Sequence, residues 1–266
     1  MVKRVLVGYG IDVDAVSGWL NTCSGAPAGP TDVSRGTFGA TVGIDRLLKL
    51  WDKYNIKTTW FIPAHSLESF LTQIKKVRDA GHEIGLHGYC HEFVAQLDIK
   101  QQRDIMSKSI DTAPAWDTSK ETIRVLEEFG IEYDHSFMHH DCQLYYAPDG
   151  SEDKVVEVPA NWHLDDWPPF VVNFKSSGGQ GYVDPDVIEK LWKKQFDYCY
   201  REYDTFFFPM TIHPQVSGKS QVILMHENII EYISSHEGVE WVTMEQMVDE
   251  FKAGRMPGAT VEAGAQ

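Results

Sequence analysis

Short apolar runs alternate with longer segments of helical periodicity along most of the chain. The run "RVLVGYG", which ends near Asp12 and Asp14, predicts a buried strand, and "KTTWFIPAHS" and "HEIGLHG" predict two more. Between these strands, "GIDRLLKLWDKYN" and "LESFLTQIKKVRDAG" repeat apolar residues at helical spacing, and Gly81 closes the second helix. The Gly/Pro/Ser-rich stretch "NTCSGAPAGPTDVSRG" predicts a loop. The first part of the chain therefore reads as β, α, β, α, β.

The same alternation continues to the end of the chain. Helices are predicted over "KETIRVLEEFG", "PDVIEKLWKKQFDYCYREY", "QVILMHENIIEYISSHEG" and "TMEQMVDEFKAG", with strands over "KVVEVPA", "TFFFPMTI" and "VEWVT". Such alternation predicts a parallel sheet covered by helices, either an open doubly wound sheet or a closed barrel. Because no repeat or linker marks a second domain, we expect one domain over residues 1–254 and a flexible tail over 255–266.

Composition narrows the class of protein and of partner. Hydrophobic residues make up 42% and charged residues 24% of the 266 positions, which is ordinary for a globular protein. A formal net charge of -15 disfavours binding to nucleic acid or to anionic membranes. The four scattered cysteines form no CxxC pair, and the amino terminus reads as a strand rather than a secretion signal. We therefore expect a cytoplasmic protein that does not bind membranes.

Two aspartates stand where the first strand ends. Side chains alternate faces along a strand, so Asp12 and Asp14, two residues apart in "GYGIDVDAV", point to the same side. Two carboxylates so close repel unless a cation or a proton lies between them. The pair therefore indicates a metal site or a raised pKa, while the alternative is a solvated strand exit, where aspartate is common.

Two histidines follow the third strand, in "GLHGYCH". His87 and His91 would lie one turn apart if the segment coils after the strand, and both rings could then reach one metal ion. The alternative is two unrelated polar residues beside a strand end. His213, in "FFFPMTIHPQVSG", follows a third strand and could act as a general acid, or could be a loop histidine serving one hydrogen bond.

These motifs strengthen one another because the carboxyl ends of parallel strands converge on one crevice or barrel mouth. One aspartate and two histidines make a three-ligand set that leaves positions open for water, as in catalytic zinc sites. The remaining aspartate could then act as a base. We expect a divalent metal as cofactor, with zinc as the first choice.

The residues resemble the polysaccharide deacetylase (NodB-homology) family of metal-dependent carbohydrate esterases, whose fold is a distorted, incomplete (β/α) barrel. The resemblance runs roughly from Val5 to Lys252. It implies that Asp12 is the catalytic base, that Asp14, His87 and His91 bind the metal, and that His213 is the general acid.

Further motifs match the same family less closely. "NWHLDDW" resembles its pocket-lining motif and "TAPAW" occupies the place of another, which implies a substrate pocket near Trp116, Trp162 and Asp165. The alternative for the tryptophans is the hydrophobic core, where tryptophan is more often found. The stretch "TAPAW" begins with Thr112, where the family usually has an arginine that orients the base. The connections near Asp111 and Ser151 are also shorter than in relatives.

"VGYGIDVDAVSGWL" and "VEVPANWHLDD" look most like the branch that contains the Helicobacter-type peptidoglycan deacetylase, cyclic imide hydrolases and cofactor-independent allantoinases. Relatives in this branch form homo-oligomers, commonly tetramers. The resemblance implies metal-dependent hydrolysis of a non-peptide C–N bond, with a polysaccharide or peptidoglycan acetamide as the first choice of substrate. A small cytosolic ring amide is one alternative, and a pseudoenzyme that binds without turnover is another.

Overall fold

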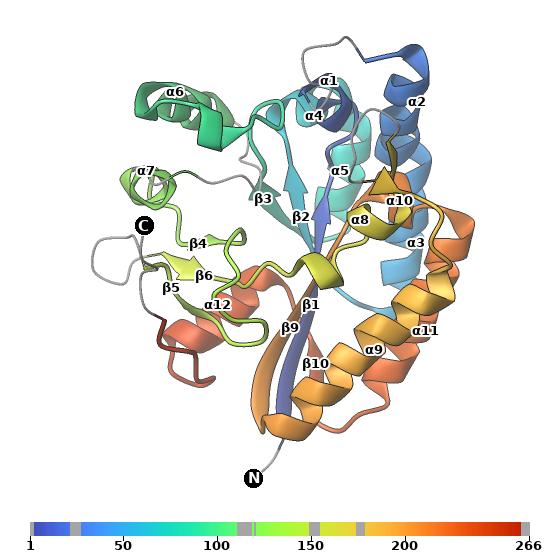
Figure 1. Ribbon diagram of the computed structural model, residues 1–266, viewed down its shortest axis with the longest axis vertical. Coiled ribbons are helices and arrows are strands. Elements are labelled where there is room, and N and C mark those ends of the chain that lie inside the picture. Colours follow the sequence, from blue (N-terminus) through green and yellow to red (C-terminus); the bar gives the residue numbers. More distant parts are fainter. Residues whose placement is uncertain are drawn as a thin grey trace.

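A five-stranded parallel sheet organises the molecule, in which the computed structural model describes residues 3–21, 28–110, 119, 121–148, 155–173 and 179–261. Strand β1 (Arg4–Asp12) lies at its centre and pairs along one edge with β9 (Thr205–Ile212). The other edge of β1 is shared: β10 (Val239–Trp241) pairs with its first half and β2 (Thr59–Ile62) with its last. Strand β3 (Glu83–Leu86) continues beyond β2. All these pairings are parallel, so the carboxyl ends of β1, β2, β3 and β9 lie at one end of the sheet (Figure 1).

A second, smaller sheet lies beside this one. It consists of β4 (Tyr133–Asp134), β6 (Val156–Glu157) and β5 (Tyr145–Tyr146), and a separate hairpin is formed by β7 (Val172–Asn173) and β8 (Gly179–Gln180). A cavity of about 650 Å³ lies between β3 and β4, and no pair of the described strands is hydrogen-bonded across it. The fold is therefore α/β with a mostly parallel sheet that does not close among the described strands, which agrees with the predicted incomplete barrel.

Twelve α-helices occur in the described part of the chain. They are α1 (Ser17–Asn21), α2 (Pro30–Phe38), α3 (Ile44–Tyr54), α4 (Ala64–Ser69), α5 (Leu71–Asp79), α6 (Ile99–Ile110), α7 (Thr122–Glu128), α8 (Trp167–Phe170), α9 (Pro185–Glu202), α10 (Pro214–Ser217), α11 (Ser220–Ser234) and α12 (Met244–Lys252). The short turns η1 (Gly39–Gly43), η2 (Val94–Gln96) and η3 (Trp162–Leu164) complete the set. Helices α3, α9 and α11 lie together on one side of the sheet (Figure 1).

Successive side chains of β1 point to opposite faces of the sheet and so contribute to two separate parts of the hydrophobic core. Val7, Tyr9 and Ile11 pack among Trp51 and other large side chains of the helical layer. Leu6 faces the opposite side and packs with residues of β6, β9 and α12. On that inner side β1 carries glycine at position 8, where an added Cβ would lie 2.7 Å from the Met247 side chain. Small residues on the inner face therefore let α12 approach the strand closely.

One predicted loop is partly helical. The stretch "NTCSGAPAGPTDVSRG" was expected to be irregular, but α2 begins at Pro30 and runs through its second half. Proline is favoured in the first turn of a helix because its fixed φ suits that position and its missing N–H would be unpaired there. The prediction weighed Pro30 as a loop residue and so was wrong for residues 30–36.

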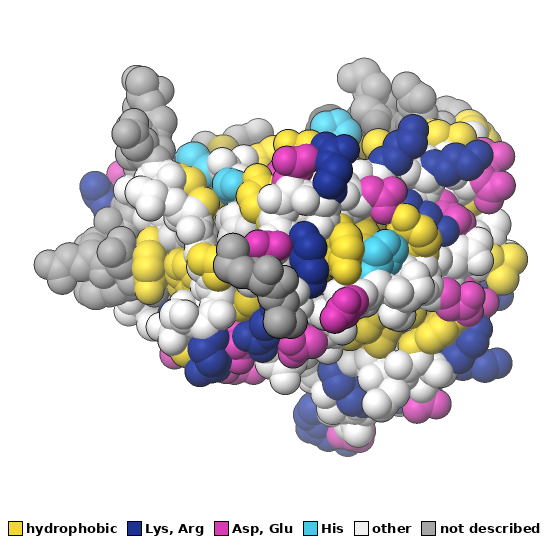
Figure 2. All heavy atoms as spheres, turned by 90° about the horizontal axis from the view of Figure 1, so that it is seen from below, with side chains coloured by type: hydrophobic (Ala, Val, Ile, Leu, Met, Phe, Trp, Pro, Cys, Tyr) yellow, Lys and Arg dark blue, Asp and Glu magenta, His cyan; other side chains and the backbone are white. Residues whose placement is uncertain are grey.

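The surface and the end of the chain add two observations. On the face seen from below, which carries the amino end of β1, basic and acidic side chains are interspersed rather than gathered by sign (Figure 2). In the described part of the predicted tail, Met256 is buried and the Ala259 N–H donates to the Leu144 carbonyl at 2.8 Å. The division into one domain and a tail stays a prediction. None of the described helices has the length and apolar composition needed to cross a membrane.

Candidate active site and metal centre

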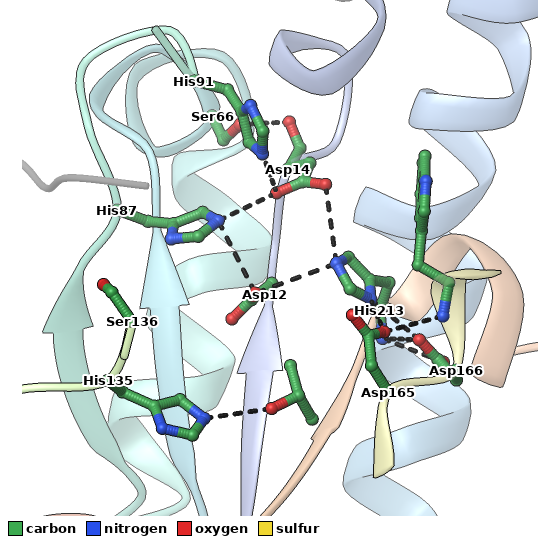
Figure 3. A network of polar contacts seen from close by, with 12 residues as sticks. Asp12, Asp14, Ser66, His87, His91, His135, Ser136, Asp165, Asp166 and His213 are labelled. Carbon is green, nitrogen blue, oxygen red and sulfur yellow. Dashed lines mark hydrogen bonds and ion pairs between the residues drawn. The ribbon is translucent and has the colours of Figure 1, made fainter. Parts of the chain in front are cut away.

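The five residues singled out from the sequence lie together at the carboxyl ends of β1, β3 and β9, with β2 lying between β1 and β3 in the sheet (Figure 3). Asp12 ends β1 and Asp14 follows it, while His87 comes directly after β3 and His213 directly after β9. His91 lies in the loop that leaves β3. Their side chains point toward one another, as expected for a parallel sheet whose strand ends converge.

The loop after β3 brings the two histidines together in a different way from the one predicted. Residues 87–93 form no helical turn. Instead, Gly88 and His91 adopt left-handed backbone conformations with φ of 74° and 58°. The Glu92 carboxylate accepts hydrogen bonds from the N–H groups of Tyr89 and Cys90, at 3.0 and 2.9 Å. The predicted one-turn spacing was therefore wrong as a local structure, although both rings do reach a common point.

Asp14, His87 and His91 have the geometry of a metal site, and we refer to them as the acid–imidazole triad. Asp14 Oδ1 lies 3.2 Å from His87 Nε2 and 3.7 Å from His91 Nε2. Ligand atoms about 2.1 Å from a tetrahedral ion lie about 3.4 Å apart, so the spacing fits zinc-like coordination. Asp14 Oδ1 and His87 Nε2 are buried and lack a hydrogen-bond partner among the residues that the structure describes. Buried polar atoms rarely go unpaired, so these donors fit a bound cation.

The second oxygen of Asp14 is held separately. The Gln215 amide donates to Asp14 Oδ2 at 3.3 Å, which leaves Oδ1 directed at the two imidazoles. Burial opposes ionisation of Asp14, but His91, His87 and His213 outweigh it and lower the pKa of this carboxyl. Asp14 is thus an ionised carboxylate with one oxygen anchored and the other available to a metal.

Asp12 lies between the triad and His213. Its Oδ2 is 3.7 Å from both His87 Nε2 and His213 Nε2, and its Oδ1 has no hydrogen-bond partner. Burial raises the pKa of Asp12 to about 6, against the opposite effect of the two histidines. A carboxyl whose pKa is raised toward neutrality is a stronger base than an ordinary aspartate, which suits the role predicted for it.

Asp166 holds His213 in place. The carboxylate accepts hydrogen bonds from His213 Nδ1 at 2.7 Å and from the His213 backbone N–H at 2.9 Å, and a third from the Ser217 hydroxyl. These bonds orient the ring so that Nε2 faces Asp12 (Figure 3). Burial alone would lower the pKa of His213, but the hydrogen bond to Asp166 and the nearby Asp165 raise it well above its ordinary value.

Sequence reasoning missed Asp166 and Gln215. It assigned Asp165 to a substrate pocket, whereas the two adjacent acids differ in what they contact. Asp165 lies 3.6 Å from His213 Nδ1 and accepts from the Trp167 N–H at 2.7 Å, while Asp166 makes the direct bond to the ring. The "DD" pair in "NWHLDDW" signalled an acid near the site but not which one contacts the histidine.

The predicted pocket residues lie in different places. Trp116 and Thr112 fall outside the described residues. Trp162 is 54% exposed and lines, with Asp165, a surface hollow of about 250 Å³. Trp167 packs its ring against His213, with ring centroids 4.9 Å apart. An aromatic wall beside the His213 imidazole is therefore supplied by Trp167.

Known proteins resemble this chain over nearly its whole length. The family model for polysaccharide deacetylase matches residues 36–125. The chain is 45% identical to the peptidoglycan deacetylase of Helicobacter pylori, with 94% of this chain and 97% of that protein covered. It is 35% identical to the peptidoglycan deacetylase-like protein FGM2 of Gibberella zeae, covering 94% and 87%. The first alignment spans 286 positions, more than this chain's 266 residues, so the relative has insertions with respect to this chain.

Solved structures share the fold. A polysaccharide deacetylase of Mycobacterium smegmatis superimposes with a TM-score of 0.86 at 26% identity, covering 100% of this chain and 96% of that one. PuuE allantoinase superimposes with a TM-score of 0.80 at 21% identity, covering 94% and 91%, which shows a common fold alone. The sequence identities, the fold and the convergence of the predicted residues agree: the chain belongs to the polysaccharide deacetylase family.

Proposed function

We propose that this protein is a metal-dependent N-deacetylase that removes acetyl groups from a peptidoglycan-type glycan. One observation carries the chemistry. Asp14 Oδ1 and His87 Nε2 are buried without a hydrogen-bond partner among the described residues, and His91 Nε2 lies at metal-ligand spacing from Asp14 Oδ1, next to Asp12 and to the Asp166-bound His213. A cation site flanked by a base and an acid is what amide hydrolysis requires.

Asp14, His87 and His91 would hold a divalent ion, which when bound polarises the substrate carbonyl and lowers the pKa of a bound water. Asp12 takes a proton from the attacking water, because its carboxyl lies beside the triad and its pKa of about 6 leaves it mostly ionised at neutral pH. His213 lies on the side of Asp12 opposite His87 (Figure 3). It carries a proton on Nε2 and gives it to the departing amine. Asp166 stabilises the charged imidazole until the proton is transferred.

The substrate class rests on the relatives. The chain shares 45% identity with a protein named peptidoglycan deacetylase, and the same name is part of the second relative's description. The cavity between β3 and β4 reaches His87 and is lined by polar groups that include Ser136 and Glu83, as hydroxyl-rich sugars require. We therefore propose an acetylated amino sugar ahead of a cyclic imide or allantoin.

We propose three further properties of the protein. Zinc is proposed as the metal because two imidazoles and one carboxylate are common zinc ligands. A cytoplasmic location is proposed because the buried Cys142 and Cys199 are free thiols, as in a reducing compartment. A homotetramer is proposed by analogy with the branch of the family that the sequence resembles. Elemental analysis, cell fractionation and light scattering test these in turn.

The test measures metal content and turnover together. Protein purified without added metal is analysed by mass spectrometry and assayed for acetate release from N-acetylglucosamine oligomers, with succinimide and allantoin as comparison substrates. We expect one ion per chain and acetate release. Asp12→Asn should keep the ion and lose activity by about 10²–10⁴-fold, as removal of a general base does. Asp52→Asn, an exposed acid on α3, is the matched control and should be unaffected.

Three outcomes would contradict the proposal. Full activity in metal-free protein would exclude the metal-dependent mechanism. A bound ion without turnover on any substrate would favour a pseudoenzyme. Turnover of succinimide or allantoin with no acetate release would reassign the substrate to a small ring amide.

A further inference from the structure

A row of buried polar groups extends from Asp166 away from the reacting residues, through α10 and α11 to β1. The Ser217 hydroxyl donates to Asp166 Oδ2 and lies 2.7 Å from His226 Nε2. His226 Nδ1 lies 3.3 Å from the Tyr9 hydroxyl. Asp166, Ser217, His226 and Tyr9 are all 0% exposed. The row thus joins three separate elements to the carboxylate that holds His213.

The chemistry of the groups fixes the direction of every hydrogen bond in this row. An ionised carboxylate only accepts, so Ser217 must give its single proton to Asp166. Ser217 can then only accept from His226, which places a proton on His226 Nε2. His226 Nδ1 is left as an acceptor for the Tyr9 O–H. All donors therefore point the same way, from Tyr9 toward Asp166.

The surroundings of the row are apolar and aromatic. The Tyr9 ring lies 4.7 Å from that of Trp51, and the His226 ring lies 5.8 Å from that of Trp192. Burial lowers the pKa of His226 to about 3, so the ring is neutral, and neutrality is what the assigned tautomer requires. A buried hydroxyl and imidazole cost free energy unless they are hydrogen-bonded, and here each finds its partner within the row.

We propose that Ser217 and His226 are positioning residues for His213, with Tyr9 completing the row. They fix the rotation of the Asp166 carboxylate, because the Ser217 hydroxyl donates to Oδ2 while Oδ1 accepts from His213 Nδ1. His213 Nε2 then stays directed at Asp12. Aligned dipoles that end on a carboxylate also stabilise its negative charge. The effect on turnover rests on the proposed deacetylase function, whereas the orientation of the row does not.

The first test compares two serine variants. Ser217→Ala removes the hydroxyl that contacts Asp166, and Ser109→Ala removes a hydroxyl from α6 that is also 0% exposed but has no hydrogen-bond partner. We expect Ser217→Ala to lower kcat by about 10–100-fold, the range seen when outer partners of site residues are removed, with KM and metal content unchanged. Ser109→Ala should keep the wild-type kcat. Equal kcat values for Ser217→Ala and wild type would overturn the proposal.

Nuclear magnetic resonance of ¹⁵N-histidine-labelled protein supplies a readout that needs no substrate. We expect His226 to carry its proton on Nε2, and Ser217→Ala to shift the ring resonances of both His226 and His213. Tyr9→Phe should shift His226 more than His213, because Tyr9 lies at the far end of the row. A proton on His226 Nδ1, or a His213 spectrum unchanged in Ser217→Ala, would refute the row even if no substrate is turned over. The expected spectra with no turnover would instead count against the proposed function alone.

Discussion

Two clusters of the same residue types lie within one site, and they differ in whether their hydrogen bonds are complete. The acid–imidazole triad of Asp14, His87 and His91 leaves Asp14 Oδ1 and His87 Nε2 without a partner. In the second cluster, the Asp166 carboxylate accepts from a backbone N–H, an imidazole and a hydroxyl. Aspartate and histidine side chains thus form two clusters in one buried region, one with unpaired polar atoms and one in which the carboxylate is fully hydrogen-bonded.

This difference separates the tasks of the two clusters. Buried polar atoms without partners are costly, and on this ground we propose that a cation completes the triad. The cluster around Asp166 is satisfied by the protein itself and can orient and charge an imidazole without any added group. Aspartate and histidine therefore have no fixed role, and the surrounding hydrogen bonds decide which one they take.

The sharpest way to break this comparison is one substitution made in the triad. Asp14→Asn keeps the shape of the side chain but removes its negative charge and replaces one of its two oxygens with an amide nitrogen. We expect loss of bound metal and a fall in kcat/KM of more than about 10³-fold, because activation of water by the ion is lost. Elemental analysis and steady-state kinetics measure both. Retention of one ion per chain would show that the triad is not the metal site.

The same substitution in the other cluster should give a different result. Asp166→Asn should keep the metal and lower kcat by about 10²–10⁴-fold, because the neutral amide no longer stabilises the protonated imidazole of His213. Its free energy of unfolding should fall by about 1–3 kcal/mol, the cost of disturbing a buried hydrogen bond. Elemental analysis, kinetics and urea unfolding distinguish this pattern from that of Asp14→Asn. Loss of the ion in Asp166→Asn would show that the second cluster is also needed for metal binding, and would contradict the separation of tasks.

Gln215 lies in α10, between His213 and Ser217 in the sequence, and contacts the triad through Asp14, so its substitution should show an intermediate effect. Gln215→Leu removes the amide that anchors Asp14 Oδ2 while keeping a buried side chain of similar size. We expect metal affinity to weaken by about 10–100-fold, as for other residues that orient a ligand. Competition with a chelator of known affinity measures the change. Unaltered affinity would mean that the β1 backbone alone orients Asp14.

The smallest effect concerns stability and pH. Burial lowers the pKa of His226 from its ordinary 6.5 to about 3. Below pH 6.5 His226 binds a proton in the unfolded chain but stays neutral in the native chain. The part of the free energy of unfolding that comes from the neutral His226 is therefore fully present above pH 6.5 and is lost as the pH falls toward 3. His226→Gln removes this titrating group. As the pH falls, the free energy of unfolding of the variant should therefore decrease less steeply than that of wild type, and the two slopes should differ by up to about 1.4 kcal/mol per pH unit. Urea unfolding of both chains in chelator between pH 7 and pH 5 measures the slopes, and parallel slopes would refute it.

The sequence predicted the parts of the site that depend on strand ends. Asp12, Asp14 and His213 end or follow long buried strands whose apolar runs are plain, and the parallel sheet then fixes their convergence. It could not predict which of Asp165 and Asp166 contacts His213, because that depends on the side-chain direction in a loop closed by contacts far along the chain. The row from Ser217 to Tyr9 was invisible for the same reason: its bonds join residues up to 217 positions apart.

The backbone of His91 has a consequence for how this position tolerates change. A φ of 58° is comfortable for glycine, is adopted by asparagine, aspartate and histidine more readily than by most residues, and is most strained for β-branched residues. Selection at position 91 therefore faces two opposed demands, since the residue that best suits the backbone cannot bind a metal. In a library of all substitutions, His91→Gly should fold better than His91→Ala yet be equally inactive, and rankings by abundance and by catalysis should diverge at this position more than at His87.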